Sequence, residues 1–340
     1  MIQSILNGTA TGVIGDRIPS TIKLLDFEPP ADDVRAGVLA GLSGDRKTLP
    51  CKLFYDQHGS QLFDAICDLP EYYPTRTELA IMRDYADAMA GMIGPRALLV
   101  EYGSGSSRKT RVLLDKLPDL AGYVPIDISC SHLLHTAEGL SARYPELSIH
   151  PVCADYTRPF WLPSFEDAPP ERVVAYFPGS TIGNFEPADA LAFLKSVRMT
   201  CGRGSGLLIG VDLKKDPNRL HAAYNDAAGV TAKFNLNILR RINRDIGSDF
   251  DLAAFAHYAF YNPAEARMEM HLVSRQNQCI NLGGGIKADF AEGESIHTEN
   301  CHKYTMDTFA ALATEAGYRR EAFWADSRGW FSVQYLVANV

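Results

Sequence analysis

The chain has 340 residues, of which 46% are hydrophobic and 22% charged, so it is long enough for a large core and for two domains. The formal net charge of −8 disfavours nucleic-acid phosphates as partners. The sequence contains no uninterrupted run of about 18 apolar residues and therefore predicts no membrane span. Composition therefore excludes a disordered chain and favours a soluble globular protein, expected to be monomeric, that binds a small molecule.

The seven cysteines are an odd number and form no Cys-x-x-Cys pair. The first residues also lack the basic-then-apolar pattern of an export signal. We therefore expect a reducing environment and a cytoplasmic location. The cysteines are Cys51, Cys67, Cys130, Cys153, Cys201, Cys279 and Cys301.

The first 50 residues mix polar and proline-containing pieces and are interpreted as a lead-in to the main domain. After them, apolar residues at helical spacing predict helices over 60–69 and 77–92. Two prolines within 70–74 predict a stiff, non-helical elbow between these helices.

From residue 97 onward, strand and helix patterns alternate. Predicted strands cover 98–102, 123–127, 148–153, 172–177 and 206–212, and predicted helices cover 108–117, 131–142 and 187–198. This alternation indicates a parallel sheet with helices on both faces and a ligand at the carboxyl ends of the strands.

At residue 213 the alternation stops. Residues 214–303 are interpreted as an inserted cap, with a long helix over 220–246, an aromatic-rich segment at 255–261 expected in its core, and a strand over 268–273. The pattern resumes with a helix over 305–316 and strands over 318–324 and 330–338. Because a short turn joins these last two strands, they are antiparallel, and the sheet contains one reversed strand.

The strand at 98–102 runs into Gly103-x-Gly105, a turn where a ligand can lie against the backbone. A glycine turn alone is weak evidence, but Asp127 ends the next strand, where a carboxylate accepts ribose hydroxyls. Asp155 follows the third strand and is placed to take an adenine amino group, with Tyr156 covering the ring. The alternative is that both carboxylates are solvated loop residues.

Dinucleotide enzymes usually carry a third glycine at the start of the following helix, but this chain has Ser107-Arg108-Lys109. Together with the reversed strand, that difference favours S-adenosylmethionine over NAD. Lys109 is then a candidate for the methionyl carboxylate, and the alternative is an ordinary surface lysine.

The loop 178–185 follows the fourth strand, where methyltransferases place acceptor-binding residues. Gly179 allows close approach, and the oxygen of the Asn184 side-chain amide can hold an amine. A simple glycine or Asx turn is the alternative interpretation.

Five stretches, in this order across nearly the whole chain, carry a family resemblance: LPEYYPTRTE, VEYGSGSSRKT, GSTIGNFEP, AAYNDAAGVTAKFN and TENCHKY. Together they resemble the histidine Nα-methyltransferases of ergothioneine biosynthesis. The resemblance implies an α/β fold, with a Rossmann-like class I methyltransferase domain over 20–212 and 305–340. It also implies an α+β substrate-binding cap over 213–304 with 1–19, and trimethylation of L-histidine to hercynine.

Site residues also follow from the resemblance. The implied S-adenosylmethionine contacts are Gly103, Lys109, Asp127, Asp155 and Tyr156. Tyr73 and Tyr224 are implied to bind the substrate carboxylate, with Tyr73, Gly179 and Asn184 as the catalytic set and the last two at the amine. Thr231 is implied near the amine, Met270 at the ring pocket, and Glu299 as acceptor of an imidazole N–H.

The resemblance fails at Cys301, because family members typically carry serine there and a thiol is a weaker hydrogen-bond donor. Methylation of another aromatic amino acid, such as tryptophan or a derivative, therefore stays open. So do an NAD-dependent oxidoreductase and a non-catalytic interaction protein that retains the fold. We expect no metal site, either at Cys130-x-His132-x-x-His135 or at His297, Cys301 and His302.

Overall fold

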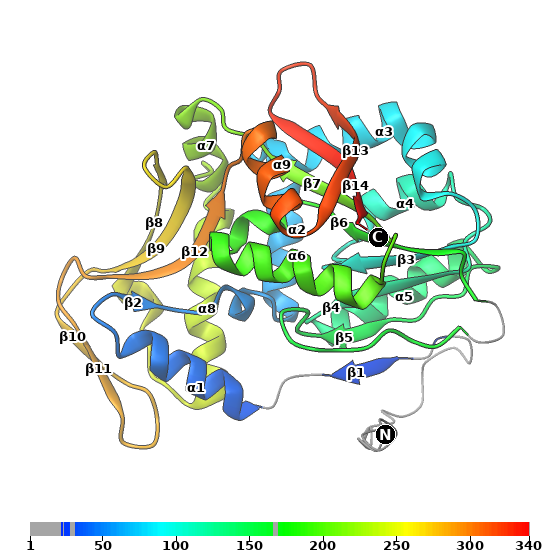
Figure 1. The fold of residues 1–340 in the computed structure, drawn as a ribbon. Coiled ribbons are helices and arrows are strands. Elements are labelled where there is room, and N and C mark those ends of the chain that lie inside the picture. Colours follow the sequence, from blue (N-terminus) through cyan, green and yellow to red (C-terminus); the bar gives the residue numbers. More distant parts are fainter. Residues whose placement is uncertain (1–21, 23, 28–30, 166–168, 340) are drawn as a thin grey trace.

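The computed structural model describes residues 22, 24–27, 31–165 and 169–339. The described residues form an eight-stranded sheet and a separate four-stranded sheet, each packed against helices (Figure 1). Residues 1–19, which the domain prediction assigns to the cap, lie outside the described residues.

The eight-stranded sheet has the order β1-β5-β4-β3-β6-β7-β14-β13. Neighbouring strands are parallel from β1 to β7, and β14 runs antiparallel to both β7 and β13. This arrangement confirms the predicted α/β fold with one reversed strand. The strands are β1 (Leu25–Phe27), β3 (Ala97–Tyr102), β4 (Gly122–Asp127), β5 (Val152–Ala154), β6 (Arg172–Phe177), β7 (Gly206–Asp212), β13 (Tyr318–Ala325) and β14 (Phe331–Ala338).

Helices cover both faces of this sheet because its central strands are apolar on both sides. All six residues of β3 are buried. One face packs against α6 (Pro187–Cys201) and α9 (Met306–Glu315), and the other against α3 (Tyr73–Ile93), α4 (Arg108–Leu114) and α5 (Cys130–Arg143). The loops that follow the parallel strands consequently meet at one edge of the sheet.

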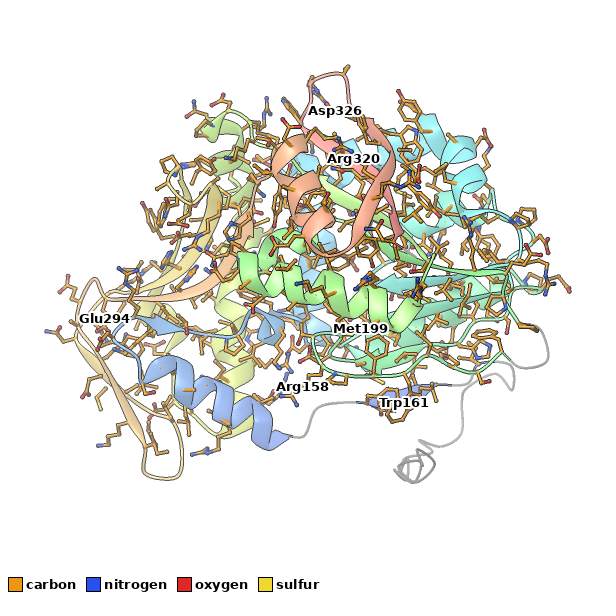
Figure 2. The ribbon with its side chains drawn as sticks, viewed as in Figure 1. Arg158, Trp161, Met199, Glu294, Arg320 and Asp326 are labelled. Carbon is orange, nitrogen blue, oxygen red and sulfur yellow. The ribbon has the colours of Figure 1, made fainter. Side chains whose placement is uncertain are left out.

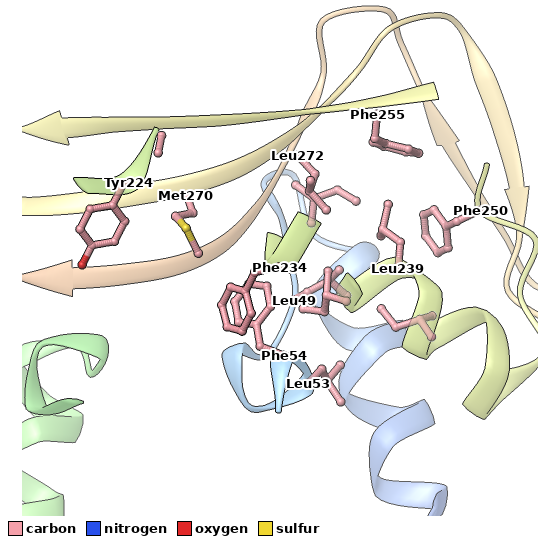
Figure 3. Close-up of a cluster of buried hydrophobic side chains, with 14 of the residues drawn as sticks. Leu49, Leu53, Phe54, Tyr224, Phe234, Leu239, Phe250, Phe255, Met270 and Leu272 are labelled. Carbon is pink, nitrogen blue, oxygen red and sulfur yellow. The ribbon is translucent and has the colours of Figure 1, made fainter. Parts of the chain in front are cut away.

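The smaller sheet has the order β2-β12-β9-β8, and α8 packs against it (Figure 3). Phe234 and Leu239 of α8 meet Met270 and Leu272 of β9 in this core. A hairpin of β10 and β11 extends from it. The elements are β2 (Lys47–Thr48), α7 (Pro217–Tyr224), α8 (Val230–Ile246), β8 (Phe255–Asn262), β9 (Arg267–Ser274), β10 (Gln278–Asn281), β11 (Lys287–Phe290) and β12 (Ser295–His302).

The expectation of one long helix over 220–246 is wrong, since α7 and α8 are separated by residues 225–229. The Asp226 carboxylate accepts hydrogen bonds from the backbone N–H groups of Val230 and Thr231, both at 2.8 Å. It thereby satisfies N–H groups that the start of a helix leaves open. Tyr224 therefore ends α7, Thr231 lies in the first turn of α8, and both line the substrate cavity described below.

Residues before β3 also pack on α8. These are α1 (Ala31–Leu42), the short 3₁₀ helix Cys51–Phe54 and α2 (Gln57–Cys67). Val38, Phe54 and Ile66 belong to the same buried cluster as the insertion, whereas the domain prediction grouped them with the large sheet. The division into two domains itself stays a prediction.

Two further expectations differ from the structure. The 70–74 stretch is not wholly non-helical, because α3 begins at Tyr73 and Pro74 occupies its first turn, where a missing N–H is tolerated. The segment 255–261 is not wholly core, because alternation along β8 leaves Tyr258 53% exposed. No helix among the described residues is both long and apolar enough to cross a membrane.

The surface of the large-sheet side carries a few isolated apolar side chains, including Trp161 and Met199 (Figure 2). The Trp161 ring packs edge-on against Phe27 of β1, with 4.5 Å between ring centroids. Trp161 therefore covers part of the edge strand β1 although most of its side chain stays exposed.

Candidate active site

The glycine turn after β3 has the backbone conformation that its sequence predicts. Gly103 has φ +72° and Gly105 has φ +46°, values that residues with a Cβ rarely adopt. The turn leads into α4, whose second residue is Lys109. Ser104 is buried, lines the cavity over this turn, and its hydroxyl has no hydrogen-bond partner among the described residues.

The side chain of Glu101, in the strand before the glycine turn, holds the surrounding elements together. Its buried carboxylate accepts hydrogen bonds from the hydroxyls of Thr110, at 2.7 and 2.8 Å, and of Tyr123. Burial raises the pKa of Glu101 to about 8, against the opposing effect of these donors. Glu101 therefore joins β3, β4 and α4 around the turn.

Asp127 is the last residue of β4, and Asp155 directly follows β5, as expected. Asp127 is half-buried and accepts hydrogen bonds from the backbone N–H groups of Gly105 at 3.2 Å and Ser129 at 2.9 Å, and it is not among the residues that line the three cavities of this site. Burial raises the pKa of Asp127. Asp155 and Tyr156 line a cavity together with Cys51, Lys52 and Ile128.

Asp155 is paired in this structure. Lys52 Nζ lies 2.8 Å from Asp155 Oδ2, and the Thr157 hydroxyl donates to Oδ1 at 2.5 Å. Burial opposes ionisation, but these two donors outweigh it and lower the pKa of Asp155. Lys52 belongs to the segment packed on α8, so this ion pair joins the two halves of the molecule.

A third cavity, which we call the substrate cavity, lies between the loop 178–185 and the smaller sheet. Seven of the predicted substrate residues line it: Gly179, Asn184, Tyr224, Thr231, Met270, Glu299 and Cys301. Its other walls include Tyr72, Asp212 and Lys303. The predicted residue Tyr73 does not line it, because its side chain is fully buried behind the wall.

Asn184 and Glu299 meet inside this cavity. The Asn184 side-chain N–H donates to Glu299 Oε1 at 3.1 Å, which leaves the amide oxygen available to an amine. Burial raises the pKa of Glu299 to about 8, against the opposing charge of Lys303. At neutral pH Glu299 is therefore mostly protonated and fits a neutral imidazole as partner.

Glu78 of α3 was not predicted as a site residue, yet it joins the two cavities. Its fully buried carboxylate accepts the Gly179 N–H at 3.0 and 3.1 Å and pairs with Lys109 Nζ at 2.5 Å. A Cβ at Gly210 would lie 2.2 Å from Glu78 Oε1, so any larger residue there would displace the Glu78 carboxylate. Glu78 thus connects the expected cofactor lysine with the expected acceptor loop.

Asp212, Lys215 and Lys303 form a second group that sequence reasoning missed. Asp212 ends β7 and accepts the Tyr73 hydroxyl at 2.7 Å. Burial alone would raise its pKa, but Lys303 and Lys215 outweigh that effect and lower the pKa of Asp212. The only sequence signals were polar residues just after an apolar strand and a lysine within TENCHKY.

Potential metal ligands cluster elsewhere in the described chain. One group joins Asp26, Cys130 and Cys153, and the other joins Glu269, His271 and His297. In the second group, Glu269 already pairs with Arg267 at 2.9 Å, and the His271 and His297 rings stack. Neither group lines the cavities above, and the expectation of no metal at the site stays a prediction.

Three cavities converge on one loop. Gly179 and Thr181 line both the glycine-turn cavity and the substrate cavity, and Thr181 and Asn184 also line the cavity of Asp155 and Tyr156. The glycine turn, the unpartnered Ser104 hydroxyl, the cation Lys109 and the acidic strand ends are chemically suited to S-adenosylmethionine. Fold and site together define an S-adenosylmethionine-dependent methyltransferase of the α/β class.

Comparison with known proteins narrows this class of methyltransferase to one family. A family model described as a histidine-specific, S-adenosylmethionine-dependent methyltransferase matches residues 34–338, and the chain belongs to that family. Histidine N-alpha-methyltransferase of Mycolicibacterium smegmatis is 41% identical over 323 residues, which cover 94% of this chain and 99% of the relative.

Two further proteins match this chain at lower sequence identity. L-tryptophan methyltransferase of Psilocybe serbica is 26% identical, over 94% of this chain and 98% of its own. A solved putative methyltransferase from Thermobifida fusca is 13% identical with a TM-score of 0.46, covering 88% of this chain and 98% of that one.

Proposed function

We propose that this enzyme transfers three methyl groups to the α-amine of L-histidine and releases hercynine, the first step of ergothioneine biosynthesis. The observation that carries the proposal is the convergence of the three cavities on loop 178–185. One cavity holds the predicted amino-acid contacts, and the other two hold predicted cofactor contacts. A nitrogen held at this loop can therefore face a methyl donor across it.

On the cofactor side, Gly103, Lys109, Asp155 and Tyr156 would hold S-adenosylmethionine, with Asp127 supporting the turn through the Gly105 N–H. When bound, it supplies a sulfonium methyl group to a nitrogen lone pair. Alignment of donor and acceptor is the main requirement, and positioning can contribute several kcal/mol to the lowering of the barrier.

On the acceptor side, the roles follow from the contacts. The free oxygen of the Asn184 amide orients the amine, and Glu78 fixes Gly179 so that the loop keeps its place. Tyr224 and Glu299 both line this cavity and are suited to a carboxylate and an imidazole. Thr231 and Met270 fill the remaining space around the ring.

The amine must lose a proton before each transfer, since a protonated amine has no lone pair. No unpaired carboxylate lies in the cavity among the described residues, because Glu299 accepts from Asn184 and Asp212 is paired with lysines. We infer that protons leave through water while Asn184 holds the nitrogen. The same contacts then serve the amine, the methylamine and the dimethylamine.

Tryptophan or a derivative is the second candidate substrate. It is favoured by the similarity to an L-tryptophan methyltransferase and by Cys301, whose thiol is a weaker partner for an imidazole nitrogen than a hydroxyl is. It is disfavoured by Glu299, since a buried polar group that loses its partner discriminates strongly against the wrong ligand.

The deciding experiment incubates the purified protein with S-adenosylmethionine and each of the twenty amino acids and measures added methyl groups by mass spectrometry. We expect histidine to gain three methyl groups and the others none, with Asn184→Ala as a control of strongly reduced activity. Trimethylated tryptophan with unmodified histidine would overturn the substrate assignment. A monomer in a reducing cytoplasm, without nucleic acid, completes the proposal.

A further inference from the structure

Two lysines and one aspartate are buried beside Tyr73 and Tyr224, the tyrosines that are predicted to bind the substrate carboxylate. The side chains of Lys215, Lys303 and Asp212 are 3%, 1% and 1% exposed. Asp212 Oδ1 lies 2.5 Å from Lys215 Nζ, and Asp212 Oδ2 lies 2.8 Å from Lys303 Nζ. Two cations therefore share one carboxylate.

At neutral pH this group carries a surplus positive charge, because burial is outweighed by Asp212, which raises the pKa of Lys303, and burial lowers the pKa of Lys215 only to about 8. Tyr73 and Tyr224 do not offset it, because burial raises the pKa of both phenols. Glu299 does not offset it at neutral pH either, since its pKa is raised to about 8. Burying an uncompensated cation is unfavourable, so the group favours an anionic ligand.

Lys215 Nζ donates to the Tyr73 oxygen at 2.8 Å behind the cavity wall. Lys215 also shares Asp212 with Lys303, so Asp212 does not fully neutralise Lys303. The positive charge reaches the cavity through Lys303, whose Nζ donates to the Tyr224 oxygen at 3.3 Å. A hydroxyl whose oxygen accepts from an ammonium becomes a stronger donor. Lys303, Asp212 and Tyr224 themselves line the substrate cavity.

We propose that Lys215 and Lys303 are specificity-determining residues that require a free α-carboxylate on the acceptor. The enzyme then methylates free amino acids and rejects their amides, the corresponding decarboxylated amine and the amino terminus of a peptide. This inference rests on the proposed function and assigns the source of the charge that recognises its substrate.

The test compares L-histidine with L-histidinamide, whose ring and amine are the same and whose carboxylate charge is absent. We expect kcat/KM of the wild-type enzyme to favour histidine by on the order of 100-fold, as when one partner of a buried charge pair is removed. In Lys303→Met and Lys215→Met, kcat/KM for histidine should fall toward that for histidinamide. Exposed Lys214 gives the matched control Lys214→Met, which should keep the wild-type ratio.

The outcomes separate the two proposals. Methylation of neither compound would contradict the proposed function, whereas equal methylation of both by the wild type would overturn only this inference. An unchanged ratio in the lysine variants, or a parallel loss with both compounds, would also overturn it. If the variants do not fold, calorimetric titration of the wild type with both compounds beside S-adenosylhomocysteine decides, since equal affinities contradict the inference.

Discussion

The Asn184 side-chain amide donates a hydrogen bond to Glu299 Oε1 over 3.1 Å, and this contact joins the loop after β6 to strand β12 of the smaller sheet. The two residues are 115 positions apart in sequence. One of them is expected to hold the reacting nitrogen and the other the ring of the same substrate. The distance between these two side chains therefore limits the length of the amino acid that can bind between them.

Replacing Asn184 with alanine should lower kcat by roughly 100-fold, because a displaced amine loses its alignment. Affinity for S-adenosylhomocysteine, measured by calorimetry, should change little. Asn184 lines part of the cavity of Asp155 and Tyr156, but the residues predicted to contact the cofactor are unchanged in this variant. Full activity of Asn184→Ala would show that the amide does not orient the nitrogen. A large loss of cofactor affinity would instead assign Asn184 to the cofactor side.

Glu299 should make stability depend on pH in a defined direction. Its pKa is raised to about 8 in the folded protein, whereas an unfolded glutamate titrates near about 4.3. Between these values the folded state binds a proton that the unfolded chain has lost, so the stability contributed by this group falls as pH rises through the window.

The variant Glu299→Gln removes this dependence. It should therefore be more stable than the wild type at pH about 8, by roughly 4 kcal/mol, and by only about 1 kcal/mol at pH about 5. Chemical denaturation across this range measures the difference. A difference that stays constant with pH would contradict the assigned protonation of Glu299.

Gly210→Ala should damage both the fold and the reaction. The added Cβ would lie 2.2 Å from Glu78 Oε1 and 3.1 Å from the Gly179 nitrogen, so the group that connects Lys109 to the acceptor loop must shift. We expect a loss of about 1–3 kcal/mol of stability, as for other overpacked cores, together with reduced kcat.

The matched control is Gly139→Ala on α5, where a Cβ has no neighbour within 4 Å. There alanine should stabilise the helix by about 0.5–1 kcal/mol and leave activity unchanged. Equal effects of the two substitutions in denaturation and activity assays would refute the packing argument for Gly210.

Cofactor binding should raise the melting temperature with S-adenosylhomocysteine but not with NAD. At about 100 times the dissociation constant, the ligand adds about 2.7 kcal/mol of stability. Asp155→Ala should lose most of this shift, whereas Glu138→Ala, an exposed carboxylate on α5, should retain it. A thermal shift with NAD alone would favour the oxidoreductase instead.

The sequence predicts the large sheet well because its signals are local. The apolar run of β3, the glycines after it and the spacing of later strands each report on a few neighbouring residues. Asn184 is a candidate from the loop after the fourth strand, whereas Glu299 follows only from the resemblance, and the structure brings the two into one cavity. Their individual roles stay predictions.

Long-range pairing is what the sequence could not supply. Glu78 follows the periodicity of α3 like any helical residue, and only the fold brings it to Gly179, 101 positions away. The helical pattern of residues 220–246 continues through residues 225–229, so it does not reveal the break between α7 and α8. At that break the Asp226 carboxylate accepts the first N–H groups of α8. Similarly, the cation pair around Asp212 exists only because β7 ends beside the residue that follows β12.

A crystal structure with L-histidine and S-adenosylhomocysteine tests the central claim most directly. The account predicts that the α-amine lies at Asn184 and Gly179, facing the cofactor sulfur, with the imidazole at Glu299 and the carboxylate at Tyr224. Histidine bound away from this loop, or with its amine turned from the sulfur, would contradict it.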